Sequence, residues 1–227
     1  MRSFLGKEHV SMPNIAIVGA GPQLGMAIAR AFGRRQFRVA MVSRDLDQVY
    51  GLAAQLRDEG IDAEGFTADV RDTDMVAEAL ADADQWLGSI DVLEFSPLPA
   101  EDFLQPVLET TREHVQAAFE FSVLGPMAAV AAVLPGMRAA GEGSLLFTTG
   151  GSALVPNPRV AGTSMAMAAE AAYLTMLHES LAGEGVYVGH LVVPVRIAPG
   201  EPLGDPDALA ERLWDLHEKQ QTFRVVV

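Results

Sequence analysis

Cysteine is absent from this 227-residue sequence, and basic residues are few. Without cysteine, the chain has no disulfide, no thiolate nucleophile and no cysteine-ligated metal site. Its five histidines are scattered and form no His-x-x-x-His pair, so we expect no metal site. Thiol chemistry and cysteine-based metal sites are therefore excluded, whereas metal binding through histidine and carboxylate is not.

Positive charge is also in short supply. Lysine and arginine total 16 against 30 acidic residues, which gives a formal net charge of −14. A surface of this sign repels nucleic-acid phosphates and anionic membranes, so we expect neither partner. No uninterrupted apolar run reaches the roughly 18 residues that a membrane-spanning helix needs, and the first residues lack the apolar stretch of a signal peptide. These features predict a cytoplasmic protein that binds a small molecule.

Short apolar runs alternate with longer helical segments along the chain. Such alternation is typical of α/β proteins, in which helices cover both faces of a parallel sheet. No change in composition marks a second domain, so we predict a single-domain, doubly wound Rossmann fold over residues 13–227, after an N-terminal extension, 1–12. The expected strands are 15–18, 37–42, 62–68, 90–95, 144–149, 186–193 and 223–227, and the expected helices are 24–35, 46–59, 72–87, 112–140, 161–182 and 207–219.

A glycine-rich turn, GAGPQLG over residues 19–25, follows the first expected strand and opens the first expected helix. In such a turn, backbone N–H groups approach a pyrophosphate at the positive end of a helix. The motif and its place near the N-terminus predict a dinucleotide site, whereas a tight turn without a ligand is the alternative. The residues expected to hold the cofactor here are Gly19, Gly21, Gln23, Leu24 and Gly25.

The end of the second expected strand discriminates between NAD and NADP. An acidic residue there would bind the ribose 2′-hydroxyl of NAD, whereas arginine suits the 2′-phosphate of NADP. This chain has Ser43 and Arg44 at that position, followed by Asp45, which is expected to cap the next helix. We therefore predict NADP(H) in preference to NAD, with a solvated loop arginine as the alternative.

Further segments have the order and spacing of a known family. These are Ala68-Asp69-Val70 after the third strand, IDVL at 90–93 and LPGM at 134–137. With the glycine turn and the chain length, they resemble the short-chain dehydrogenase/reductase family over about residues 14–227. The resemblance implies a seven-stranded sheet, an oxidoreductase acting on a carbonyl or alcohol, and a cofactor whose adenine faces Asp69 and Val70. It also implies a homodimer or homotetramer.

At the four positions that hold the family's catalytic side chains, as the resemblance aligns them, this chain has residues of other types. Its Asn maps to Ser122, and its Ser maps to Gly150. Its Tyr maps to Thr163, thirteen residues after Gly150, and its Lys maps to Met167, four residues further on. An aliphatic hydroxyl is a far weaker acid than a phenol, and methionine supplies no charge. The sequence therefore predicts an atypical member with a weakened or repurposed site.

Two ionisable residues lie inside expected strands. Glu94 falls in a strand that should be buried, where its pKa would rise, so it is a candidate acid or base. His190 is expected to be a hydrogen-bonded core residue. Three functions stay open: an NADP(H)-dependent oxidoreductase with a non-standard proton donor, a catalytically inactive dinucleotide-binding sensor or subunit, and a non-redox enzyme that uses the same pocket.

Overall fold

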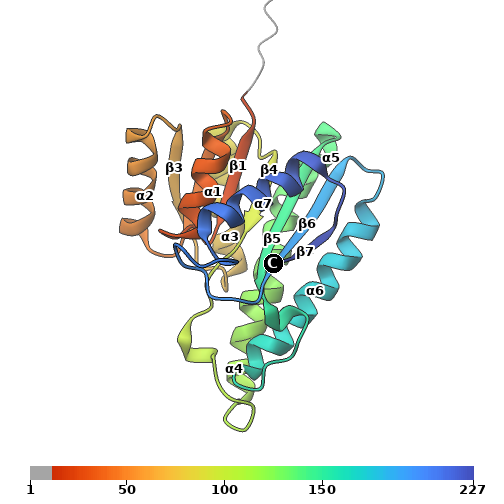
Figure 1. The fold of residues 1–227 in the computed structure, drawn as a ribbon. Coiled ribbons are helices and arrows are strands. Elements are labelled where there is room, and N and C mark those ends of the chain that lie inside the picture. The colour runs from red at the N-terminus through yellow and green to blue at the C-terminus, as the bar shows by residue number, and fades with distance from the viewer. Residues whose placement is uncertain (1–11) are drawn as a thin grey trace, which may run out of the picture.

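A computed structural model describes residues 12–227, and seven parallel strands form its single sheet (Figure 1). Their order is β3-β2-β1-β4-β5-β6-β7, so the direction of winding reverses at β1. This confirms the predicted doubly wound fold. The N-terminal extension expected at 1–12 lies outside the described residues except for its last position. The strands are β1 (Asn14–Val18), β2 (Arg38–Ser43), β3 (Ala63–Thr67), β4 (Val92–Phe95), β5 (Gly143–Gly150), β6 (Val186–Val193) and β7 (Arg224–Val226).

Helices connect the strands and cover both faces of the sheet. Aspartate side chains at the N-caps start three of them: Asp45, Asp72 and Asp205 accept backbone N–H groups of the first turn. The cap at Asp45 was expected. The main helices are α1 (Leu24–Gly33), α2 (Leu46–Asp58), α3 (Thr73–Leu87), α4 (Arg112–Phe119), α5 (Gly125–Ala140), α6 (Ala161–Leu181) and α7 (Pro206–Lys219).

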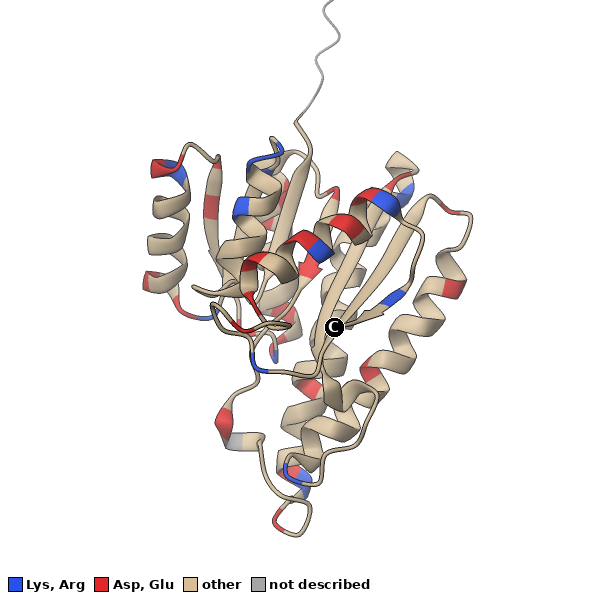
Figure 2. Cartoon of the chain, in the orientation of Figure 1, with Lys and Arg blue, Asp and Glu red and all other residues tan. Residues whose placement is uncertain are grey.

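Two apolar cores lie on the two faces of the sheet. One joins Phe95 and Phe147 to residues of α3, α5 and α6, and the other joins Ile17 and Leu191 to residues of α1 and α7. In Figure 1, α7 crosses the sheet on the same side as α1, with which it is in contact. The charged residues lie mainly on helices and loops, whereas the central strands carry few (Figure 2). Burial of both faces explains why the strands read as continuous apolar runs.

The expected long helix at 112–140 contains a π-helical turn, Glu120–Leu124, between α4 and α5. Pro126 accounts for it, because proline has no N–H to donate to the carbonyl four residues earlier. The Gly125 N–H bonds instead to the Glu120 carbonyl, five residues back. The turn places Ser122 at a widened part of the helix.

The same stretch, Arg112–Ala140, has the length and composition of a membrane-crossing helix, although polar residues interrupt its apolar runs. In this fold, 44% of its most apolar window is buried. The core helix of a globular domain passes the same test, so the stretch is weak evidence for a membrane span.

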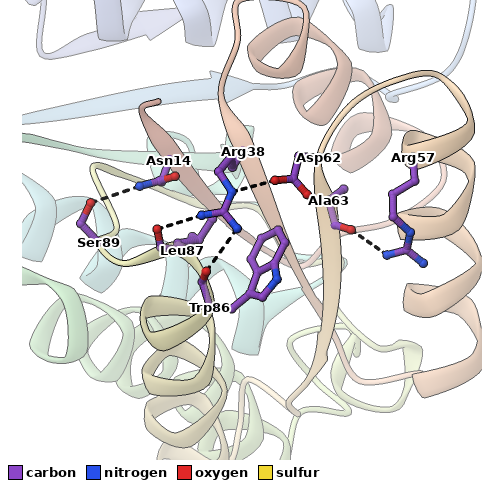
Figure 3. Close-up of polar contacts among 8 residues, drawn as sticks. All are labelled: Asn14, Arg38, Arg57, Asp62, Ala63, Trp86, Leu87 and Ser89. Atoms are coloured by element: carbon purple, nitrogen blue, oxygen red, sulfur yellow. Dashed lines mark hydrogen bonds and ion pairs between the residues drawn. The ribbon is translucent and has the colours of Figure 1, made fainter. Parts of the chain in front are cut away.

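Arg38 joins three elements at the amino ends of the strands (Figure 3). Its Nε donates to Asp62 Oδ2 at 2.8 Å, and its terminal nitrogens donate to the carbonyls of Leu87 and Trp86 at 3.0 and 3.2 Å. Its guanidinium also lies 4.4 Å from the centroid of the Trp86 ring. Arg38 therefore satisfies carbonyls at the end of α3, whose last turn has no basic residue of its own.

Replacing this arginine is expected to weaken the fold. We expect Arg38→Met to lower the free energy of unfolding by about 1–2 kcal/mol, because two helix carbonyls lose a charged donor while the Asp62 pair is partly exposed to solvent. Urea unfolding measures the change. Arg34→Met, at an exposed arginine, is the matched control and should shift stability by less than about 0.5 kcal/mol. Equal effects of the two substitutions would contradict the role given to Arg38.

Candidate functional site

A cleft of about 260 Å³ lies at the carboxyl ends of the first strands, where the winding of the sheet reverses. Ligands of open α/β sheets bind at this kind of switch point. Six of the predicted cofactor residues line it: Gly19, Gly21, Ser43, Arg44, Asp69 and Val70. The rest of the lining consists of Ala20, Pro22, Gln48, Ala68, Arg71, Pro97, Leu98, Ala100 and Phe121.

The glycine turn is held in a conformation that requires glycine. Gly19 has a φ of +91°, and a Cβ there would collide with the backbone of Pro97. A Cβ on Gly25 would lie 2.8 Å from Ala20 Cα, so α1 also packs tightly against the turn. Both positions therefore bring backbone atoms closer than any side chain would allow.

The start of α1 offers backbone donors beside this cleft. Gln23, Leu24 and Gly25 are not part of the lining, but no acceptor lies within residues 12–227 for their N–H groups. The first turn of α1 also carries no acidic side chain and no side-chain cap. These orphan donors, together with the helix dipole, favour an anion at this end. By contrast, the N–H groups of Gly19 and Ala20 both bond to the Val42 carbonyl at 2.9 Å.

Two arginines and one aspartate set the charge of the cleft. Arg71 donates from its backbone and side chain to Asp69, at 3.0 and 3.2 Å. Burial acts to raise the pKa of Asp69, but these hydrogen bonds and the charges of Arg71 and Arg44 outweigh it, so the pKa falls. Asp69 is thus an anion that faces arginine, and the exposed Arg44 side chain adds positive charge at the cleft.

Two of the four residues at the family's catalytic positions line a second cavity, of about 10 Å³. Ser122 and Met167 both line it, and a Cβ on Gly150 would lie 3.7 Å from Met167 Sδ. Thr163 is buried one turn before Met167, and its hydroxyl has no partner among the described residues. The remaining lining residues are Phe95, Pro97, Phe121, Thr148, Thr149 and Glu170.

Glu94 is fully buried, as expected, but its side chain points to the opposite face of the sheet from Phe95, which lines the second cavity. It alternates with Phe95 along β4 and pairs with Ile17, so it points to the face covered by α1 and α7. Ser96 Oγ and Thr148 Oγ1 bond to its carboxyl oxygens at 2.9 and 3.1 Å. Burial raises the pKa of Glu94 to about 8, although both hydrogen bonds act to lower it.

His190 is the hydrogen-bonded core histidine that the sequence predicted. Arg224 Nε donates to its Nδ1 at 2.9 Å, and its Nε2 lies 2.8 Å from Thr149 Oγ1. Burial lowers the pKa of His190 to about 3, and the charge of Arg224 acts in the same direction. The imidazole is therefore neutral.

Sequence reasoning missed several residues of both cavities. Arg71 follows the third strand by only a few positions, which was a usable signal for the first cavity. Glu170 lies seven residues after Thr163 and three after Met167, so helical spacing alone would have placed it on their face of α6. Pro97 and Phe121 line both cavities and come from irregular or π-helical segments, which have no periodic signal.

Comparison with known proteins relates this chain to dehydrogenases. A family model described as short chain dehydrogenase matches residues 13–199. The chain is 29% identical to 1-deoxy-11-beta-hydroxypentalenate dehydrogenase of Streptomyces exfoliatus over 185 residues, which are 81% of this chain and 67% of that protein. It is 28% identical to 2,3-dihydro-2,3-dihydroxybenzoate dehydrogenase of Bacillus subtilis (strain 168) over 168 residues, which are 73% of this chain and 63% of that relative.

Solved structures share the fold. L-sorbose reductase from Gluconobacter frateurii, solved with NADPH and L-sorbose, superposes with a TM-score of 0.85 at 19% identity, over 96% of this chain and 95% of that one. A metagenomic short-chain oxidoreductase in complex with NADP gives a TM-score of 0.81 at 23% identity, over 96% of both chains. With most of its length matched by the family model, this chain belongs to the short-chain dehydrogenase family.

Proposed function

We propose that this protein is an NADP(H)-dependent oxidoreductase that acts on a carbonyl or alcohol substrate through a non-standard site. The observation that carries the proposal is the position of Arg44 and Ser43 in the same cleft as the glycine turn. A guanidinium at the end of the second strand suits the 2′-phosphate that distinguishes NADP from NAD. NADP and NADPH in the two solved relatives also support it.

The residues around the cleft fit such a cofactor. A Cβ on Gly21 would have nothing nearer than the Gly19 carbonyl oxygen, at 4.0 Å, so the turn is open there, and the orphan N–H groups of Gln23 and Leu24 supply donors to a pyrophosphate. Asp69 and Val70 would flank the adenine, as the family resemblance implies. When bound, the cofactor supplies or accepts a hydride, and the protein positions it and excludes water.

The catalytic positions favour a site that works without the usual groups. Gly150 offers no side-chain donor, and the hydroxyl of Thr163 is too weak an acid to replace a phenol. Met167 offers no charge to the nicotinamide ribose. Loss of acid–base assistance alone costs about 10²- to 10⁴-fold in rate. We therefore expect slower turnover than in a dehydrogenase with a phenol, unless another acid acts.

A titration of Arg44 variants tests cofactor choice. We expect Arg44→Ala to raise the Kd for NADPH by about 10- to 100-fold, because a charge-assisted contact to phosphate is worth about 1.5–3 kcal/mol. The Kd for NADH should stay within about twofold, and calorimetry measures both. Arg34→Ala removes the same charge at an exposed position on the far end of α1 and is the control. If Arg44→Ala leaves NADPH binding unchanged, the 2′-phosphate assignment is wrong.

A cofactor-binding protein without redox activity is the second candidate. The small size of the second cavity favours it, since about 10 Å³ holds one water-sized group and no ring. Oxidation of bound NADPH by added aldehydes and ketones separates the two candidates, because only an oxidoreductase accelerates that reaction.

We also propose that the protein forms a homodimer or homotetramer. Support comes from apolar side chains exposed on α5 and α6, which include Met127, Met165 and Met176, at 43–58% of their full exposure. Light scattering coupled to size-exclusion chromatography should give two or four times the mass of the 24.2 kDa chain. A mass of one chain at micromolar concentration would refute this proposal.

A further inference from the structure

The Glu170 carboxyl has no partner in the described part of the chain. It lies on α6, one turn after Met167, and is 4% exposed. Neither a hydrogen bond nor an ion pair reaches it within residues 12–227, yet it lines the cavity of about 10 Å³. Burial raises the pKa of Glu170 well above its usual value, and a buried carboxylate without a partner is costly, so the fold favours the protonated carboxyl. A buried carboxylic acid with no acceptor has a proton to donate.

Thr149, in the same cavity, is set up as a second donor. Because Arg224 donates to Nδ1 of His190, the neutral imidazole carries its proton on Nε2. That proton is then donated to Thr149 Oγ1, at 2.8 Å. The Thr149 hydroxyl, which accepts from His190, is therefore free to donate its own proton to another acceptor. Because Thr149 lines the cavity, a group bound there can be that acceptor. The pairing of Arg224 with the buried His190 therefore fixes the direction in which the Thr149 hydroxyl donates.

Ser122 completes the group from a third element. Its side chain is 3% exposed, lines the same cavity and has no hydrogen-bond partner within residues 12–227. It sits in the π-helical turn, which contacts α6; Figure 1 places α4 and the start of α6 side by side below the sheet. The side chains of Thr149 on β5, Glu170 on α6 and Ser122 in the π-helical turn thus line one space, which has room for a single oxygen atom.

We propose that Glu170, Thr149 and Ser122 form a pocket for the carbonyl oxygen of an aldehyde or ketone, and that Glu170 is the acid that protonates this oxygen. The inference rests on the proposed function. A bound NADPH, held at the glycine turn and Arg44, would supply the hydride, with its two electrons, that the carbonyl carbon accepts. The Glu170 O–H bond breaks as the proton passes to the oxygen, so the products are the alcohol, NADP⁺ and the Glu170 carboxylate. After the alcohol leaves, a proton from bulk solvent, relayed by water that enters the pocket, restores the Glu170 carboxyl group.

The surroundings of the pocket suit this role. Its walls include Phe95, Phe121 and Met167, which keep water away and keep Glu170 protonated. In the same low-polarity surroundings, the two hydroxyl donors stabilise negative charge on the oxygen as the hydride arrives. Met167 stands at the position of the family's lysine. A lysine there, one turn before Glu170, would lower the pKa of the Glu170 carboxyl and favour its ionised form, whereas methionine does not.

Infrared spectroscopy of dead-end complexes tests the pocket without turnover. The wild-type protein is mixed with NADP⁺ and either cyclohexanone or acetone, ketones that have no hydrogen on the carbonyl carbon to give to the oxidised cofactor. We expect the C=O stretch of a protonated carboxyl group to shift when the probe is added. This band should be missing in Glu170→Gln, which keeps the shape of the side chain but has no acidic proton. Glu179→Gln, at an exposed position of the same helix, is the control and should match the wild type.

Kinetics provide the second readout. We expect Glu170→Gln to reduce the probe with NADPH about 10²-fold more slowly or worse, while its Kd for NADPH stays within about twofold of the wild type. Loss of one donor in Thr149→Val should slow reduction as well, by about tenfold or more. A Glu170→Gln variant that keeps full activity, or that keeps the shifting carboxyl band, overturns the assignment.

The two proposals fail in different ways. If the wild type binds neither NADPH nor NADP⁺, the proposed function fails, and a band shift with the carbonyl probe alone still supports the pocket. If the wild type binds NADPH but neither probe shifts the Glu170 band, the pocket assignment is overturned and the cofactor assignment stands.

Discussion

Gly19→Ala is expected to lose most of its affinity for NADPH and to lower the free energy of unfolding by about 3 kcal/mol or more. A side chain at a positive φ costs about 1–2 kcal/mol, and the new Cβ would also collide with the Pro97 backbone, for which overpacking adds about 1–3 kcal/mol. Relief of the collision would push apart the glycine turn and the segment after β4, which together line the cleft. Urea unfolding and calorimetric titration measure the two effects.

A second glycine separates backbone strain from collision. Gly60 has a similar φ of +83°, but a Cβ there would meet nothing within 4 Å. Gly60→Ala should therefore cost only the conformational part, about 1–2 kcal/mol, and leave NADPH binding unchanged. If Gly19→Ala binds NADPH as tightly as Gly60→Ala does, the turn has no part in the cofactor site.

Glu94→Gln is expected to change how stability depends on pH. The pKa of Glu94 is about 8 in the folded protein against 4.5 as its ordinary value. The folded wild type therefore keeps the Glu94 proton at pH values where the unfolded chain has lost it. The contribution of this proton to the stability of the wild type is highest below pH 4.5 and falls as the pH rises towards 8. At about 1.4 kcal/mol per pKa unit, the wild type should lose roughly 4 kcal/mol relative to Glu94→Gln between pH 5 and pH 8.

Unfolding curves at pH 5, 6.5 and 8 measure this difference. Glu78→Gln, at an exposed position of α3, is the control and should run parallel to the wild type. Glu170 contributes to the wild type and to both variants alike, so it cancels from the comparison. Parallel curves for Glu94→Gln and the wild type would mean that Glu94 is ionised or solvated in the folded protein.

The fold was predictable because the sequence repeats one pattern. Buried strands such as Val186–Val193 are nearly continuous apolar runs, and helices separate each strand from the next. Apart from the π-helical turn inside the expected helix 112–140, the differences lie mainly at the ends of elements. Ile90 and Asp91 were placed in the fourth strand, but β4 begins at Val92. Asp91 instead accepts the Asn14 N–H at 2.8 Å, a contact between distant segments that no local pattern reveals.

The glycine turn and Arg44 could be found because their chemistry depends on neighbours in the sequence. The π-helical turn could not, since it arises where one proline interrupts a long helix and its exact register depends on packing. The chain of hydrogen bonds that ends at the second cavity could not be predicted, for a related reason. Thr149, His190 and Arg224 come from three different strands, and only the register of the sheet brings them together.

This chain is proposed to bind NADP(H) in preference to NAD(H). Calorimetric titration of the wild-type protein with NADPH, and in parallel with NADH, tests it most directly. We expect NADPH to bind at least about tenfold more tightly than NADH, because Arg44 meets a phosphate that only NADPH carries. Equal affinities, or no binding of either dinucleotide up to millimolar concentration, would contradict this account.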